Sequence, residues 1–361
     1  MDPKQDPSRH CQKPNEWPEA VRTAWRDANT KGDVLTEGGR SAHWSPKTRV
    51  TVEKSYGRWL TWLKANGLLQ PMHDVADHVT REVVARYIVD LTVINAPFTV
   101  RSRILNLYFA LSAMAPDMDW GWLCAVARRL RKMATPVREK RPRLVGSDVL
   151  FAFGLELMQE AERAGEGTPL FRAKRYRDGL IIAFLAVVPL RRANLASMEI
   201  GTHFLEHPDG YWVHFDGEET KTGVEIDRPA PQALRVFFDR YLAEYRPFLV
   251  RCSERRSRKS AIRKADALWI SAYGTPMSEG AIYGRITLLT KAKFGRALTP
   301  HLFRDCAATT IATVAPELVA ATKDVLNHSN GQTAERHYNH ARSLQASRTY
   351  QAHVANLQRT L

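Results

Sequence analysis

The chain contains few cysteines, and their arrangement argues against a structural metal site. Four occur among its 361 residues: Cys11, Cys124, Cys252 and Cys306. None belongs to a C-x-x-C pair or to the cysteine and histidine spacing of a zinc site. Scattered thiols of this kind are typical of a reducing compartment, so we expect free cysteines in a cytoplasmic protein.

The chain also lacks long apolar runs and nucleotide-binding motifs. No run of about 18 uncharged apolar residues is present, and the N-terminal segment has no apolar signal core. A P-loop, a glycine-rich dinucleotide fingerprint and an Asp/Glu cluster typical of metal catalysis are missing as well. We therefore expect no membrane association, and chemistry that uses no cofactor.

Acidic residues are outnumbered by basic ones. The chain has 53 Lys and Arg against 38 Asp and Glu, a net charge of +15. Such an excess favours a polyanionic partner, and nucleic acid is the usual one. Hydrophobic residues make up 44% of the chain, enough to form real cores, and the length is typical of about two domains.

The first third of the chain predicts an arm and a helical bundle. Residues 1–45 are polar and rich in proline, glycine and charge, so we expect a flexible N-terminal arm with at most one short helix. Such an arm is either a simple tail or an accessory DNA contact. Residues 46–135 contain apolar positions at helical spacing and predict four amphipathic helices. The first should start at Ser45-Pro46, a capping serine followed by a proline.

Basic residues are concentrated where this bundle ends. Residues 136–146 predict an extended linker, because Pro136 and Pro142 interrupt helix formation. Lys and Arg side chains neutralise phosphates and release counterions, so we expect backbone contacts with DNA here; a solvated charged surface is the alternative. The residues expected to make these contacts are Arg128, Arg129, Arg131, Lys132, Arg138, Lys140, Arg141 and Arg143.

Residues 147–361 predict a mixed domain with a C-terminal tail helix over 342–361. Two apolar helical segments precede an arginine pair, Arg191-Arg192. Two short strand-like segments, 211–215 and 224–226, then flank a turn that contains Lys221. The expected fold class is mainly α with a small β-sheet (α+β).

The last part of the chain contains polar residues that suit a phosphate site. His301 and Arg304 are three residues apart and share a helical face, so imidazole and guanidinium can converge on one anion. His328 follows in Leu-Asn-His, and Tyr338, ten residues later, is a plausible oxygen nucleophile. Each fragment alone is common, whereas the ordered set is specific.

In this order the residues resemble the tyrosine recombinases (phage integrase family), whose pattern is H-x-x-R, then L-G-H, then tyrosine. The segment Leu-Arg-Arg-Ala-Asn-Leu is similar to the family's first arginine box and places its arginine on Arg191, or on Arg192 if the register shifts by one. Lys221 matches the family's β-hairpin lysine. The resemblance covers about residues 180–345, and the bundle weakly resembles the family's SAM-like core-binding domain.

Three features depart from the family pattern. Asn194 occupies a position where the family commonly has a carboxylate, and an amide offers an arginine only a neutral hydrogen bond. Asn327 stands at the glycine of L-G-H, and the interval from His328 to Tyr338 is one residue longer than is commonest. Tyr350, inside the expected tail helix, is a second tyrosine to consider as nucleophile.

The resemblance implies a site-specific recombinase that cuts and rejoins DNA through a 3′-phosphotyrosyl intermediate without metal or ATP. Tyr338 would be the nucleophile, Arg191 and Arg304 would hold the phosphate, and Lys221 would protonate the leaving 5′ oxygen. His328 would donate to the phosphate, and His301 would do the same or accept the tyrosine proton.

The resemblance also implies partners and leaves alternatives open. The partners would be double-stranded DNA with a specific recombination site, a homo-tetramer on synapsed DNA (monomer or dimer otherwise) and accessory DNA-bending proteins. Integration or excision of a mobile element is the expected role, with chromosome dimer resolution and transposon recombination as alternatives within the same class. The alternatives are type IB topoisomerase-like relaxation of DNA and a catalytically inactive DNA-binding relative. The tail helix would pack on its own domain or on a neighbouring subunit.

Overall fold

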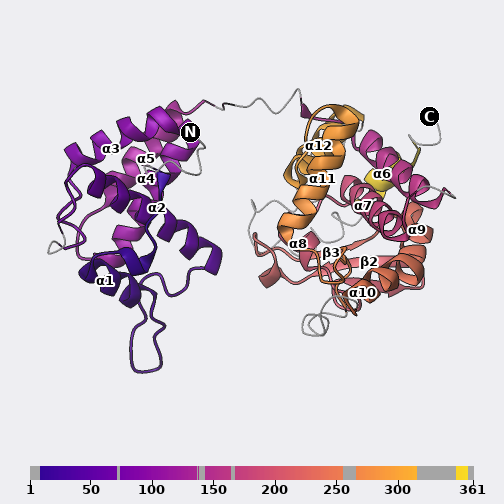
Figure 1. Cartoon of the computed structure of the whole chain (residues 1–361), viewed down its shortest axis with the longest axis horizontal. Helices are drawn as coiled ribbons and strands as arrows, with labels where there is room; N and C mark the ends of the chain where they lie inside the picture. The colour runs from indigo at the N-terminus through magenta and orange to yellow at the C-terminus, as the bar shows by residue number, and fades with distance from the viewer. Residues whose placement is uncertain are drawn as a thin grey trace. The chain divides into compact units, whose positions relative to one another are not determined.

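The computed structural model describes residues 9–70, 74–135, 137, 143–163, 167–254, 266–314 and 347–356. The chain divides into two compact units, Met1–Glu139 and Lys140–Leu361 (Figure 1). This division falls within the segment expected to be a linker. No helix within the described ranges is long and apolar enough to cross a membrane.

The regular secondary structure described in unit 1 is entirely helical (Figure 1). Its α-helices are α1 (Glu19–Asn29), α2 (Pro46–Ala65), α3 (Arg81–Ile94), α4 (Pro97–Met114) and α5 (Gly121–Met133). Local capping sets two of the starts, because Ser45 Oγ accepts a hydrogen bond from the Thr48 amide and Thr80 Oγ1 accepts one from Val83. Helix α2 lies at the centre, with Trp59 and Leu63 almost completely buried.

Residues 11–29 and Ser41 to Trp44 pack onto this bundle, whereas residues 30–38 are exposed; this differs from the flexible arm expected for residues 1–45. Trp17 and Trp25 are 3% and 6% exposed, and the Trp17 ring centroid lies 5.3 Å from that of Tyr56 in α2. The Trp17 indole N–H donates to the Gln12 carbonyl over 3.0 Å. Two tryptophans and Val21 form an apolar face whose burial outweighs the polar composition around them. Residues 1–8 lie outside the described ranges.

Unit 2 combines helices with a small three-stranded sheet. The helices are α6 (Ser147–Glu162), α7 (Pro169–Val187), α8 (Arg192–Ser197), α9 (Arg235–Arg240), α10 (Arg246–Glu254), α11 (Glu279–Phe294) and α12 (Pro300–Val314). The strands β1 (Phe204–His207), β2 (Gly210–Phe215) and β3 (Ile226–Pro229) form an antiparallel sheet in the order β1-β2-β3. The predicted fold class, mainly α with a small β-sheet, is confirmed.

Helix α7 is the centre of unit 2 and leads directly to the arginine pair. Its residues from Tyr176 to its end are buried. It packs closely on α6: a Cβ at Gly154 would lie 2.6 Å from the Gly179 carbonyl oxygen, so neither glycine has room for a side chain. In the same helix, the Asp178 carboxylate, 1% exposed, pairs with Arg177 at 2.6 Å and with Arg285 of α11 at 2.7 Å. This network fixes α7 against α11.

The described part of the tail is helical over 347–356 and packs on unit 2 itself. Tyr350 is 3% exposed, and its hydroxyl donates to the Ala186 carbonyl of α7 over 3.1 Å. Burial raises the pKa of Tyr350. Gln351 donates to the Pro229 carbonyl of β3. A buried hydroxyl that is already engaged with backbone is a packing group, which weakens Tyr350 as a candidate nucleophile.

Candidate functional site

Arg191 lies at the junction between α7 and α8, facing the loop between β2 and β3. Its Nη1 donates to Thr222 Oγ1 over 3.3 Å, and burial lowers the pKa of its guanidinium. Arg192 points elsewhere, because it pairs with Glu279 of α11 at 3.1 Å and lies over the Tyr283 ring at 5.7 Å. The two adjacent arginine side chains therefore point in different directions. Arg192 contacts α11, whereas Arg191 contacts the loop that carries Lys221.

Arg304 approaches the same junction from α12. Its side chain is buried, and its Nη1 donates to the Pro189 carbonyl, two residues before Arg191, over 2.6 Å. Burial, together with the positive charges of Arg191 and Arg228, lowers the pKa of Arg304 to about 10. Because this pKa remains well above 7, Arg304 keeps its charge at neutral pH.

Arg228 of β3 is a member of this cationic group that sequence reasoning missed. It is 4% exposed and lies in register with Val213 of β2. Its charge acts on Arg304, as noted above. The only signal in the sequence is the spacing: Arg228 comes two residues after Ile226, and side chains two apart in a strand point to the same face, here the buried one. A desolvated guanidinium at Arg304 that is repelled by two others favours binding of an anion, whose charge would offset the repulsion.

Lys221 is exposed in the loop between the 3-10 segment Gly217–Glu219 and β3. This loop is held to α8 by the residue that departs from the family pattern, since the Asn194 amide donates to the Glu219 carbonyl over 3.2 Å. The Glu219 carboxylate contacts His203 Nε2 at 2.9 Å, a hydrogen bond that lowers the pKa of Glu219. Thr222, next to Lys221, accepts from Arg191. The neutral hydrogen bond that Asn194 was expected to offer an arginine is thus made to the backbone of the loop that carries Lys221.

The two histidines and the tyrosine expected in the site are only partly described. His301 is exposed at the start of α12, one helical turn before Arg304. His328 and Tyr338 lie outside the described residues. Arg191 and Arg304 are therefore brought together, with Lys221 on the loop that Arg191 contacts and His301 on the helix that carries Arg304.

The residues expected to contact the DNA backbone fall into different environments. Arg128, Arg129, Arg131 and Lys132 are exposed at the end of α5 in unit 1. Arg143 is half-buried in unit 2, and its Nη2 donates to the Ala297 carbonyl over 2.6 Å, so it takes part in the fold of that unit. The remaining three, Arg138, Lys140 and Arg141, lie outside the described residues.

Comparison with solved structures finds proteins of similar fold. The chain is similar to the XerH site-specific recombinase bound to difH substrate in a pre-cleavage complex, with a TM-score of 0.51 and 12% identity over 84% of this chain and 76% of that one. A post-cleavage complex of XerH with palindromic difH gives 0.50 and 13% over 84% and 75%. At this level of identity the likeness shows the fold alone. No protein-family model and no curated protein sequence matches the chain.

Proposed function

We propose that this protein is a site-specific DNA recombinase that cuts and rejoins DNA through a 3′-phosphotyrosyl intermediate. The observation that carries the proposal is the meeting of Arg304 with the Pro189–Arg191 segment, far apart in sequence, beside the loop of Lys221. A fold similar to that of a recombinase crystallised with its DNA substrate supports it. So does the net charge of +15.

In the proposed reaction the Tyr338 oxygen attacks the scissile phosphorus, and the bond from phosphorus to the 5′ oxygen breaks. The tyrosine proton passes to His301 or to water, and Lys221 gives a proton to the departing 5′ oxygen. Reversal of these steps by the 5′-hydroxyl of another strand rejoins DNA. Because the covalent bond conserves the phosphodiester energy, neither ATP nor a metal ion is required.

The arginines would stabilise the charge that grows on the non-bridging oxygens. Arg191 and Arg304 each have a planar guanidinium that can present two N–H donors to a phosphate. Desolvation lowers the pKa of both groups, and the charge of Arg191 also lowers that of Arg304, so these effects are present before DNA arrives. A phosphate therefore enters a site whose cations are already in place, and it relieves the repulsion. His328 is proposed to donate one further hydrogen bond.

The wider assignment follows from the same proposal. The substrate would be double-stranded DNA with a specific recombination site, contacted at its phosphates by the exposed cations of α5, and the active assembly a homo-tetramer on two synapsed sites. Accessory DNA-bending proteins are proposed as further partners. The proposed role is the integration or excision of a mobile element. The experiment must distinguish this proposal from two alternatives: topoisomerase-like relaxation of DNA, and DNA binding without catalysis.

The test is covalent trapping on nicked suicide duplexes built from the DNA that flanks the gene. Wild type should give a band on a denaturing gel, Tyr338→Phe should give none, and Tyr350→Phe is the matched control that should retain it. A band that persists in Tyr338→Phe would refute the assigned nucleophile. Binding without any band would indicate the inactive relative, and relaxation of a supercoiled plasmid lacking the site would indicate a topoisomerase.

A further inference from the structure

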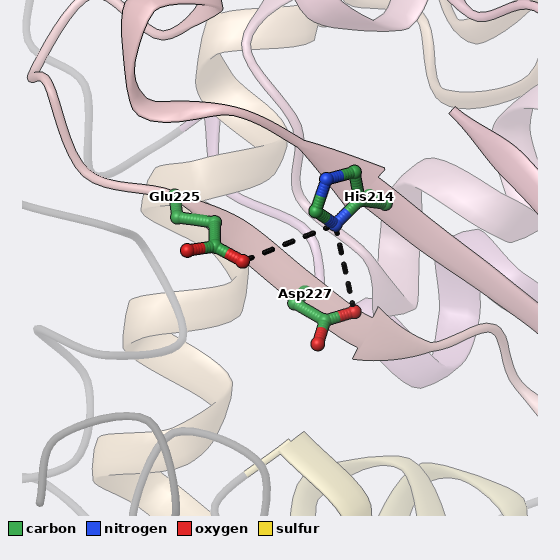
Figure 2. A group of neighbouring side chains, drawn as sticks. All are labelled: His214, Glu225 and Asp227. Carbon is green, nitrogen blue, oxygen red and sulfur yellow. Dashed lines mark ion pairs between the residues drawn. The ribbon is translucent and has the colours of Figure 1, made fainter. Parts of the chain in front are cut away.

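The hairpin formed by β2 and β3 carries a cluster of one imidazole and two carboxylates (Figure 2). His214 of β2 and Asp227 of β3 are register partners, so their side chains emerge on the same face of the sheet. Glu225 is two residues before Asp227 and shares that face. His214 Nδ1 lies 3.9 Å from a Glu225 oxygen and 3.9 Å from an Asp227 oxygen.

We propose that His214, Glu225 and Asp227 bind one divalent transition-metal ion, for which Zn²⁺ is the probe. Imidazole nitrogen and carboxylate oxygen are the ligand types that Zn²⁺ and its neighbours in the first transition row accept. His214 and Asp227 belong to the two-stranded ladder and Glu225 directly precedes β3, and three protein ligands leave the remaining coordination positions to water.

The spacing of the three side chains is close to what such an ion requires. An ion about 2.1 Å from each ligand atom keeps those atoms roughly 3.0 to 3.4 Å apart in octahedral or tetrahedral geometry. Here the ligand atoms all lie within 4.8 Å of one another. Rotation of the Glu225 side chain, which is 57% exposed, would bring its carboxylate closer, while the ladder holds the backbone of His214 and Asp227 side by side.

A fourth side chain lies near the other nitrogen of the imidazole. His214 Nε2 lies 3.5 Å from an Asp216 carboxylate oxygen. This carboxylate favours the tautomer with its proton on Nε2, which leaves the Nδ1 lone pair directed to Glu225 and Asp227. A carboxylate behind a metal-binding histidine is a common feature of protein metal sites, where it fixes the tautomer and raises the basicity of the ligand.

Charge gives a second reason for a cation at this place. Asp216, Glu225 and Asp227 surround a single imidazole, so the group has a formal charge of −3 when His214 is neutral. Protonation of His214 would leave −2, whereas a divalent ion would leave −1. This concentration of negative charge lies beside a loop that must meet a polyanion if the proposed function holds, and a bound ion would reduce the repulsion.

The position of the cluster suggests what the ion would do. Strand β2 ends at Phe215 and β3 begins at Ile226, so the cluster lies at the base of the loop that carries Lys221. An ion that joins the two strands there would restrict this loop. The ion-binding site stands independently of the proposed function, and only its effect on Lys221 rests on that proposal.

The test uses the full chain, freed of metal with a chelator and titrated with ZnCl₂ in a calorimeter. Wild type should bind Zn²⁺, and His214→Gln should lose one site or weaken it by about tenfold or more. His207→Gln is the matched control, because His207 is exposed in β1 of the same sheet and outside the cluster. Asp216→Asn should weaken binding about tenfold while the number of sites is unchanged.

A second readout detects the site without counting ions bound elsewhere. Hydrogen exchange of residues 216–225 should slow when Zn²⁺ is added to wild type, and should not change in folded Glu225→Gln or His214→Gln. Wild type without a Zn²⁺ site, or a His214→Gln variant with wild-type stoichiometry and affinity, would overturn the proposal. Neither assay contains DNA. Failure of the recombinase proposal would therefore not affect the interpretation of the Zn²⁺ result, and failure to bind Zn²⁺ would not affect the recombinase proposal.

Discussion

Replacing Arg304 with glutamine should make the folded protein more stable while it strongly reduces DNA cleavage. Arg304 is 5% exposed, and burial together with the charges of Arg191 and Arg228 lowers its pKa from 12.5 to about 10. One pKa unit corresponds to about 1.36 kcal/mol, so keeping this guanidinium charged costs the folded state about 3 kcal/mol. The charge of Arg304 is therefore held at the expense of stability.

The sign of the effect follows from the direction of the shift. A cation whose pKa is lowered by folding destabilises the folded state at every pH below that pKa; the penalty begins to decline only as the pH rises above about 10, and it is lost above the ordinary value of 12.5. At pH 7 the penalty is complete. Glutamine removes it but also removes the hydrogen bond to Pro189, worth about 1 to 2 kcal/mol. A net stabilisation of about 1 to 2 kcal/mol should remain.

Urea unfolding followed by circular dichroism measures the stability, and suicide-duplex trapping measures cleavage. Cleavage by Arg304→Gln should fall by about 10²- to 10³-fold, as when one donor to a developing oxyanion is removed. Arg192→Gln is the matched control: its exposed ion pair with Glu279 contributes at most about 1 kcal/mol, and cleavage should persist. An Arg304→Gln protein that is clearly less stable than wild type, or that cleaves at the wild-type rate, would refute this reasoning.

Three further predictions concern packing and the lysine loop. Tyr350→Phe should lose about 1 kcal/mol of stability, from one buried hydrogen bond, and keep cleavage; loss of cleavage in a folded protein would contradict a packing role. Gly179→Ala should destabilise unit 2 by about 1 to 3 kcal/mol in urea unfolding, because its Cβ would lie 2.6 Å from the Gly154 carbonyl; unchanged stability would contradict the close packing. His203 lowers the pKa of Glu219, so protection of the loop from hydrogen exchange should be complete above about pH 4.5 and decline as the pH falls through the lowered value; Glu219→Gln should remove this decline.

Local signals in the sequence predict much of the helical structure. Helices begin after Ser45 and Thr80 because each side chain accepts a hydrogen bond from the backbone amide three residues later. Such contacts between near neighbours can be predicted from the sequence. The strand expected over 211–215 is β2, observed as Gly210–Phe215. Strand β3 begins at Ile226, where the expected segment ends, and β1 was not expected because its four residues lack a regular alternation.

Contacts between distant segments account for what the sequence does not predict. Trp17 and Trp25 lie in a polar stretch, and their burial depends on α2, which follows later in the chain. Arg228 joins the cationic group because β3 pairs with β2, and a single arginine in a short strand carries no local sign of that. The link from Asn194 to Glu219 likewise depends on the docking of α8 against the loop. Motif order thus indicates the chemistry, and tertiary structure decides which side chains support it.

The most direct test of the central claim is to identify the amino acid that becomes linked to DNA. Trypsin should release Tyr338 in the peptide spanning 337–342, in which it is the only tyrosine, and Tyr350 in a separate peptide. Mass spectrometry of nuclease-treated, trapped complex should find a nucleotide attached to Tyr338 through a 3′-phosphate. A nucleotide on another residue, or a 5′-linked adduct, would contradict the proposed mechanism.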